Sequence, residues 1–260
     1  MSDGSAMTDR DRPVAFVSAA AGAGIGSAIV FELAREGWDV VVTDAHERRV
    51  GELAERLTNE FGREFLGIHL DVTDYAAVGA AAQRAVDWRG GLQGLVNNAG
   101  WNKLEPIVEM SPETWQRTLD VDLTGTFNCL RNVLPVMIAS GGGAIVNISS
   151  IAAWETSTDH GAAYSAAKAG INALTRVAAA EVGRHGIRVN AIAPGLIYND
   201  FLIKVYPKEF FEGYAEERSR IGRVGQPRDV AALAAFLMSD KAGYITGEVY
   251  GISGGVLPQT

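Results

Sequence analysis

Short apolar runs with almost no polar residue inside them recur along the chain, and this feature most limits how it can fold. The runs that we expect to form strands lie near 13–18, 39–43, 65–70, 92–96, 144–148, 187–193 and 248–252. Strands that are apolar on both faces are typical of a parallel sheet with helices on both sides. The pattern therefore predicts an α/β fold with a doubly wound parallel sheet of about seven strands.

Segments with helical periodicity separate these strands, as a doubly wound sheet requires. They span about 27–36, 47–61, 75–88, 111–139, 164–185 and 226–239. Ser111 and Pro112 suit the N-cap and first helical position of the fourth segment. Residues 1–12 are polar and charged, and we expect them to be a disordered lead-in. No repeat or linker divides the remainder, so 13–260 is predicted to be a single domain.

Composition limits the partners and cofactors of this domain. The net charge of -8 argues against nucleic acid or an anionic membrane as the main partner. A single cysteine, Cys129, excludes an intramolecular disulfide, and the four histidines lack ligand spacing, so no metal site is expected. The first residues carry no secretory signal, and glycines and Glu32 interrupt the apolar stretch 14–34. These observations favour a cytoplasmic protein with a small-molecule substrate.

A glycine-rich turn follows the first predicted strand and opens the first predicted helix. It reads Ser-Ala-Ala-Ala-Gly-Ala-Gly-Ile-Gly over residues 18–26, and its cofactor-binding candidates are Gly22, Gly24 and Ile25. Small residues in such a turn let backbone N–H groups approach a pyrophosphate at the helix N-terminus. The strand–turn–helix context therefore predicts a dinucleotide site.

Acidic residues end the next two predicted strands. Asp44 lies where a carboxylate can accept a hydrogen bond from a ribose 2′-hydroxyl and would repel a 2′-phosphate, which favours NAD over NADP. Alternatively, Asp44 only caps the following helix, and three nearby basic residues keep NADP open: His46, Arg48 and Arg49. Asp71 and Val72 are placed to contact adenine, or Asp71 caps the turn at Thr73 and Asp74.

Tyr164 and Lys168 lie four residues apart on a predicted alanine-rich helix. This spacing puts both side chains on one face, one turn apart. A lysine ammonium beside a phenol favours the phenolate and lowers the tyrosine pKa from its ordinary value of about 10. The pair is therefore a candidate general acid/base that moves a proton to or from an oxygen. The alternative is an ordinary surface pair.

These motifs, together with Asn97–Gly100, Ser150 and Pro194-Gly195, resemble the short-chain dehydrogenase/reductase family in order and spacing over about residues 13–255. The resemblance implies a Rossmann-like fold, a nicotinamide cofactor and reversible hydride transfer. In that family a serine polarises the substrate oxygen, a tyrosine transfers the proton, and a lysine lowers the tyrosine pKa and holds the nicotinamide ribose. The matching catalytic candidates are Ser150, Tyr164 and Lys168, with Ser150 preferred to Ser149 by its separation from the tyrosine. Further implied cofactor contacts are Asn98, Ile197 and Asn199.

The chain departs from the family pattern at three places. The glycine turn has alanines in place of the early glycine and one extra residue. Asp122 stands where the family often has an active-site asparagine, thought to act through its backbone carbonyl by holding a water that relays protons to the lysine. An aspartate can preserve that role and add a charge that stabilises Lys168 as a cation, or it only fixes a helix bulge. Asn199 replaces a threonine; it can still bond the carboxamide, while Ile197 packs on the nicotinamide.

The segment 196–225 is unusually aromatic and reads as irregular. It contains Tyr198, Phe201, Tyr206, Phe210, Phe211 and Tyr214. In the family this segment covers the substrate, so the aromatic residues suggest a sizeable apolar substrate that is cyclic, steroid-like or a hydroxyacyl thioester. The alternative is an amphipathic helix packed on the core or on another subunit. Further pocket candidates are Trp101, Trp154 and His160.

The expected function is an NAD-dependent oxidoreductase that acts on a secondary alcohol or ketone. The alternative is a non-catalytic protein of the same fold that binds NAD as a sensor or scaffold. The resemblance also implies a homotetramer or homodimer, formed through the long helices at 111–139 and 161–185 and through the C-terminal helix and strand.

Overall fold

The computed structural model describes residues 12–155, 160–199, 202 and 207–257, and in this part of the chain seven strands form one sheet. The strands are β1 Val14–Val17, β2 Asp39–Asp44, β3 Leu66–His69, β4 Gly94–Asn97, β5 Gly143–Ile148, β6 Ile187–Pro194 and β7 Val249–Ile252. Their order is β3-β2-β1-β4-β5-β6-β7, and every neighbouring pair is parallel. The predicted doubly wound parallel sheet is therefore confirmed.

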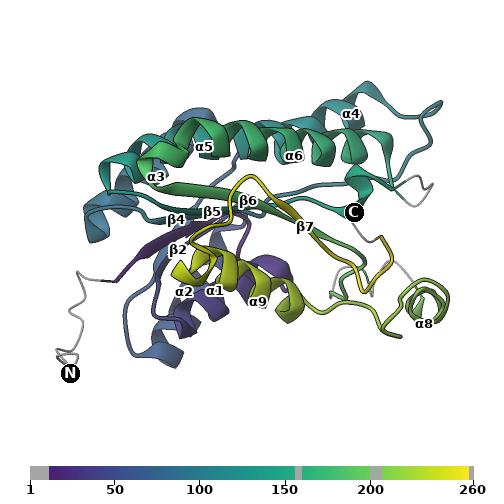
Figure 1. Cartoon of the computed structure of the whole chain (residues 1–260), viewed down its shortest axis with the longest axis horizontal. Coiled ribbons are helices and arrows are strands. Elements are labelled where there is room, and N and C mark those ends of the chain that lie inside the picture. The colour runs from purple at the N-terminus through teal and green to yellow at the C-terminus, as the bar shows by residue number, and fades with distance from the viewer. Residues whose placement is uncertain (1–11, 156–159, 200–201, 203–206, 258–260) are drawn as a thin grey trace.

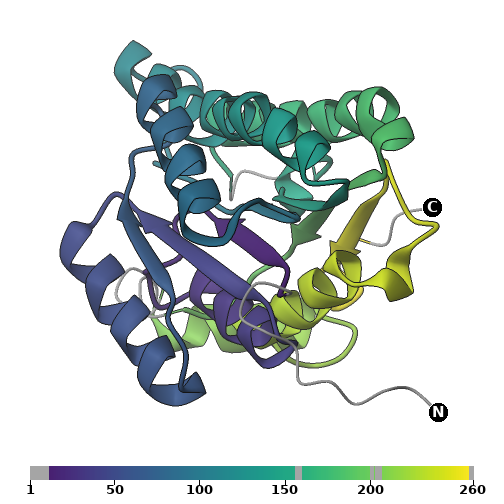
Figure 2. The ribbon, with the colours of Figure 1, turned by 90° about the vertical axis from the view of Figure 1, so that its left-hand side faces the viewer.

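Two helix layers enclose this sheet (Figure 1). One layer contains α1 Ile25–Arg35, α2 Glu47–Phe61 and α9 Pro227–Met238; the other contains α3 Tyr75–Arg89, α5 Gly125–Ala139 and α6 Ala162–Val182. Figure 2 shows the sheet between these layers from a second direction. Val40 and Val42 enter the core cluster with α1 and α9, whereas Val41 enters the cluster with α3 and α5. Because successive side chains point to opposite faces, both faces of each strand must be apolar.

The predicted helix 111–139 is wrong as one continuous α-helix. The chain forms α4 Pro112–Thr118, a π-helical turn η1 Leu119–Thr124, and then α5. In η1 the Gly125 N–H donates to the carbonyl oxygen of Asp120, five residues back. A π-turn accommodates one extra residue, and such turns are frequent at functional sites. Ser111 and Pro112 do open α4 as predicted, with the Ser111 hydroxyl accepting the Thr114 N–H at 3.1 Å.

Smaller elements complete the description. Helix α8 Lys208–Glu217 forms within the segment expected to be irregular, and its buried residue is Phe211. Three 3-10 turns are η2 Ile151–Ala153, η3 Gly183–His185 and η4 Asp240–Ala242. The predicted lead-in 1–12 lies outside the described residues except for Arg12. Among the described residues, no helix combines the length and apolar character needed to cross a bilayer.

Cys129 is buried in the core between α3 and α5. Burial raises the pKa of its thiol to about 12, so the thiol stays protonated at neutral pH. The described residues also hold no group of three or more His, Cys, Asp or Glu side chains arranged for a metal ion.

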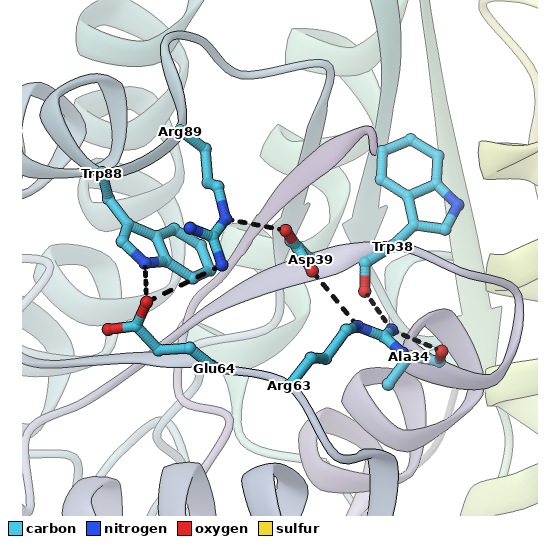
Figure 3. A network of polar contacts seen from close by, with 7 residues as sticks. All are labelled: Ala34, Trp38, Asp39, Arg63, Glu64, Trp88 and Arg89. Carbon is cyan, nitrogen blue, oxygen red and sulfur yellow. Dashed lines mark hydrogen bonds and ion pairs between the residues drawn. The ribbon is translucent and has the colours of Figure 1, made fainter. Parts of the chain in front are cut away.

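A charged network fastens the amino end of β2 to the helices around it (Figure 3). Asp39 is fully buried, and its two carboxylate oxygens accept hydrogen bonds from Arg63 Nε at 3.2 Å and Arg89 Nε at 2.8 Å. Arg63 also donates to the carbonyl oxygens of Ala34 at 2.7 Å and Trp38 at 2.9 Å. The network therefore joins α1, β2 and the ends of α2 and α3 at the amino end of β2, whereas the predicted site lies at the carboxyl ends of the strands.

Candidate active site

The turn between β1 and α1 leaves space in front of a helix N-terminus. Helix α1 begins at Ile25; its N-cap residue, Gly24, provides no side-chain cap, and no acidic residue lies in the first turn. A β-carbon added at Gly22 or Gly24 would meet no atom within 4 Å. At Gly26 it would lie 2.6 Å from the Ala19 carbonyl oxygen, so Gly26 permits close packing of α1 on the turn. These features fit a pyrophosphate bound by the backbone N–H groups of the first helical turn.

Ala19 stands in this turn with a φ of +48°, a left-handed conformation that favours glycine. The Asn98 side-chain NH₂ donates to the carbonyl oxygens of Ala19 at 2.9 Å and Ser18 at 3.2 Å. In return, the Ser18 hydroxyl accepts the N–H groups of Asn98 at 2.9 Å and Ala99 at 3.1 Å. The side chains of the residues that directly follow β1 and β4 thus hold the altered turn, and a direct contact of Asn98 with a cofactor stays a prediction.

Asp44 faces the same turn from the end of β2, where it is buried. Its Oδ2 accepts the Ala21 N–H and its Oδ1 accepts the His46 N–H, each at 3.0 Å. The bond to His46 fixes the residue before α2, and the bond to Ala21 links the carboxylate to the glycine-rich turn. Each carboxylate oxygen keeps a second lone pair, so Asp44 can still accept a ribose hydroxyl. Arg48 is directed to Glu52, 3.7 Å away in an exposed ion pair.

Asp71 and Val72 have different environments at the end of β3. Asp71 is exposed, and its Oδ1 accepts both the Thr73 N–H at 2.9 Å and the Thr73 hydroxyl at 2.8 Å. Asp74 caps α3 by accepting the Ala77 N–H at 2.9 Å. The turn-capping interpretation is therefore confirmed. The side chain of Val72 is buried in the core, and the contact of these residues with adenine stays a prediction.

Ser150, Tyr164 and Lys168 come from two elements that pack at the carboxyl end of β5. Ser150 accepts the Ala152 N–H at 3.1 Å in η2, and η2 packs on α6, which carries the other two residues. Lys168 is 3% exposed; its Nζ donates to the Ile148 carbonyl at 3.0 Å and lies 5.3 Å from the centroid of the Tyr164 ring. The tyrosine and lysine are therefore neighbours in a buried site and not a surface pair.

Ser149 has a different environment from Ser150. Its hydroxyl is buried and donates to the main-chain carbonyl of Lys168 at 3.2 Å. That bond commits the only Ser149 O–H to the backbone of α6. The preference for Ser150 as the serine that meets a substrate oxygen is thereby supported.

Asp122 reaches Lys168 from the π-helical turn η1. Its Oδ1 lies 3.1 Å from Lys168 Nζ, and both side chains are almost completely buried. Burial alone would lower the pKa of Lys168, but the nearby Asp122 charge and Tyr164 outweigh it and raise that pKa, so Lys168 is an ammonium at neutral pH. The expected contact between the Asp122 charge and Lys168 is present, and the expected helix bulge is present at the same residue.

Ile197 and Asn199 lie just after β6. Ile197 is buried in the core cluster that contains α1 and α9. Asn199 donates from Nδ2 to the Ile197 carbonyl at 3.2 Å and accepts the Leu202 N–H at 3.0 Å on Oδ1. These bonds shape the turn into the cover segment, 196–225, and the contacts with nicotinamide stay predictions.

The aromatic residues of the cover segment pack on one another. Phe211 lies edge-on to both Tyr198 and Phe210, with ring centroids 5.3 and 5.5 Å apart. The Tyr214 hydroxyl accepts the Leu196 N–H at 3.4 Å. Part of the aromatic segment therefore forms a helix, α8, whose Phe211 is buried, as in the alternative of a packed amphipathic helix. Two other aromatic residues of the prediction, Phe201 and Tyr206, lie outside the described residues.

Glu155 is a site residue that sequence reasoning missed. Its side chain is largely buried; it contacts His160 Nε2 at 3.1 Å and pairs with Arg218 from the end of α8. The His160 ring lies 6.5 Å from the Tyr164 ring, which agrees with its place among the predicted pocket residues. The sequence around Glu155 does not predict this ion pair, because Arg218 lies 63 positions away along the chain.

Known proteins resemble the chain over nearly its whole length. A family model described as enoyl-(acyl carrier protein) reductase matches residues 19–257. The (5R,7aS)-5-hydroxy-7a-methyl-1-oxo-2,3,5,6,7,7a-hexahydro-1H-indene-carboxyl-CoA reductase of Mycobacterium tuberculosis (strain ATCC 25618 / H37Rv) is 41% identical over 246 residues, 94% of this chain and 92% of that protein. The 3-oxoacyl-(acyl-carrier-protein) reductase of Staphylococcus aureus (strain Mu50 / ATCC 700699) is 36% identical over 233 residues, 90% of this chain and 94% of that protein.

A solved structure gives the same result in three dimensions. L-Sorbose reductase from Gluconobacter frateurii, in complex with NADPH and L-sorbose, superimposes with a TM-score of 0.88 at 32% identity, covering 96% of this chain and 98% of that one. The family match, the two reductases and this structure agree with the motif order and with the buried tyrosine–lysine pair. The chain therefore belongs to the short-chain dehydrogenase/reductase family of nicotinamide-dependent oxidoreductases.

Proposed function

We propose that this protein catalyses reversible, NAD-dependent hydride transfer at a secondary alcohol or ketone carbon of a carbocyclic or acyl CoA thioester. The observation that carries the proposal is the buried Lys168 ammonium beside Tyr164, with Ser150 at the neighbouring strand end. A bound nicotinamide supplies the hydride acceptor or donor. In oxidation the Tyr164 oxygen would accept the proton of the carbinol O–H, and a nicotinamide held by Lys168 and the turn before α1 would take the hydride released from the carbinol C–H bond. Reduction reverses each transfer.

The hydrogen bonds of the site suit these roles. Because the Ser150 oxygen accepts the Ala152 N–H, its own O–H remains a donor for the substrate oxygen. Lys168 donates to the Ile148 carbonyl and pairs with Asp122, so one of its three N–H groups remains for a ribose hydroxyl. The protein thus contributes orientation and proton transfer, which are the usual contributions of a protein to cofactor chemistry.

The substrate class is supported by the names of two relatives. One is called the reductase of a hydroxy-oxo-hexahydroindene-carboxyl-CoA, and the other the reductase of 3-oxoacyl groups on a carrier protein. Both names combine a hydroxyl or oxo carbon with a thioester carrier. They agree with the cyclic and hydroxyacyl-thioester substrates that the aromatic cover segment suggests.

A cofactor-reduction screen tests the proposal. Purified protein is offered NAD or NADP with bicyclic hydroxy acids, their CoA thioesters, hydroxyacyl-CoAs and steroid alcohols, and absorbance at 340 nm reports turnover. We expect turnover with NAD on a cyclic or acyl hydroxy thioester, at least roughly tenfold faster than on the free acid, because remote binding energy aids the reaction. NADH binding without turnover on any member of the panel would favour the non-catalytic sensor instead.

The preference for NAD is proposed to depend on Asp44. Replacing Asp44 with alanine removes the carboxylate that repels a 2′-phosphate, so the ratio of kcat/KM for NAD to that for NADP should fall at least roughly tenfold. The bond from Ala21 is lost for both cofactors and does not alter the ratio. Asp87→Asn is the matched control, since that exposed carboxylate on α3 accepts a hydrogen bond from Gln83 and has no predicted role in cofactor binding, so the ratio should stay within about twofold. An unchanged ratio in Asp44→Ala would contradict the assignment.

A further inference from the structure

The side chain and the main chain of Asp122 are engaged by three different elements. Oδ1 pairs with Lys168 Nζ of α6 at 3.1 Å, and Oδ2 accepts the Trp101 N–H at 2.7 Å from the loop after β4. The main-chain carbonyl of Asp122 accepts the Thr126 hydroxyl at 2.7 Å. Asp122 itself has no exposed surface. The contact with Lys168 is therefore made by the carboxylate, while the main-chain carbonyl accepts a hydroxyl from one turn further along the helix.

Both neighbours of the carboxylate are donors, and this limits what position 122 can accept. An aspartate presents two acceptor oxygens, whereas an asparagine presents one acceptor and one NH₂ group. An asparagine in this geometry would turn its NH₂ toward the Lys168 ammonium or toward the Trp101 N–H. It would also leave the ammonium without its buried counter-charge, which is costly in a site that excludes water.

The surrounding backbone leaves room for this pair. A β-carbon at Gly100 would lie 3.2 Å from Asp122 Oδ1 and 3.6 Å from Lys168 Nζ. The first distance is tighter than most side chains tolerate, so the glycine that ends the Asn97–Gly100 motif lets the loop pass close over the ion pair. The loop, the π-helical turn and α6 are thereby joined at one carboxylate.

We propose that Asp122 is a positioning residue that acts through its carboxylate, by fixing the Lys168 ammonium beside Tyr164 and the loop at Trp101. This inference rests on the proposed function for its catalytic consequence, while the coupling between Asp122 and Lys168 is independent of the substrate. The proposed effect comes from the carboxylate, which accepts from the Trp101 main-chain N–H and carries the charge opposite to the Lys168 ammonium.

The test compares Asp122→Asn with Asp120→Asn, which removes the same charge from the same π-helical turn. Asp120 accepts a hydrogen bond from Gln116 at 2.7 Å and serves as the matched control. Asp122→Asn should lower kcat roughly 10- to 100-fold through misplacement of Lys168, and weaken NADH binding, measured by fluorescence titration, by about fivefold or more. Asp120→Asn should leave both values within about twofold of the wild-type values. Wild-type kcat and NADH affinity in Asp122→Asn would overturn the proposal.

A second comparison separates positioning from general loss of structure. A Lys168→Met background removes the ammonium, so Asp122 no longer has a charge to position, and adding Asp122→Asn should change NADH affinity less than about twofold. Asp122→Asn alone should lower the unfolding temperature by roughly 5–10 °C, and the double variant should recover most of that loss. Equal effects of Asp122→Asn in both backgrounds would refute the coupling. Because binding and unfolding need no turnover, absence of activity in the wild-type protein would count against the proposed function and not against this inference.

Discussion

Replacing Tyr164 with phenylalanine is expected to lower kcat by roughly 10²- to 10⁴-fold, the range associated with loss of a general acid/base. The substitution removes one oxygen from a half-buried ring and leaves the Lys168 contacts with Asp122 and Ile148 in place. NADH affinity and the unfolding temperature should therefore stay close to their wild-type values. Initial rates at 340 nm and fluorescence titration with NADH measure the two quantities separately.

Tyr75→Phe is the matched control for this prediction. It makes the same chemical change at an exposed position on α3, so kcat should be unaffected. Wild-type turnover in Tyr164→Phe would rule out proton transfer by the tyrosine. Loss of NADH binding in the same variant would show that the ring has a structural role that the proposed mechanism does not include.

The largest expected effect on stability is at Asp39. Asp39→Ala leaves the Arg63 and Arg89 guanidinium groups without their shared carboxylate, and each of these side chains is only 15% exposed. Breaking a buried ion pair by removing one partner costs about 3–5 kcal/mol, which is a large share of the stability of an ordinary domain. Some water can reach the arginines, so we expect a loss of about 3 kcal/mol in the free energy of unfolding, measured in urea.

The folded Asp39→Ala protein should keep its kcat at a temperature below its unfolding transition. We expect this because Asp39 lies at the amino end of β2, whereas Ser150 and Tyr164 lie near the carboxyl ends of the strands. Asp87→Asn, on an exposed carboxylate bonded to Gln83, should change the unfolding free energy by less than about 0.5 kcal/mol. A loss below about 1 kcal/mol in Asp39→Ala would show that the network adds little to stability.

Local chemistry explains which elements could be predicted from the sequence. The predicted helix 47–61 has the same bounds as α2. Its C-terminal end is predictable because Gly62 follows in a left-handed conformation that stops the helix. The same reasoning fails over 111–139, where α4, a π-turn and α5 take the place of one continuous α-helix. That turn is held by contacts of Asp122 with Trp101 and Lys168, which are distant in the sequence.

In the candidate site, too, some contacts could be predicted from the local sequence and others could not. The pairing of Tyr164 and Lys168 follows from helical spacing, and that of Asp44 with the glycine turn follows from its place at a strand end. Nothing in the local sequence indicates that Asn98 holds Ala19 or that Glu155 meets Arg218. Such contacts depend on which strand ends and helix ends the folded sheet brings together.

The two ends of the cover segment pair with each other just after β6. Ile197 and Gly225 form an isolated parallel bridge, with the Tyr198 N–H donating to the Gly225 carbonyl at 2.8 Å and the Gly225 N–H donating to the Leu196 carbonyl at 3.0 Å. Because the two ends of the segment are held together, its length has little effect on the stability of the fold. Doubling the length of a flexible loop raises the entropic cost of closing it by only about 0.6 kcal/mol. We therefore expect that the cover segment can be exchanged or lengthened by mutation while the sheet, the glycine-rich turn and the residues Ser150, Tyr164 and Lys168 keep their positions.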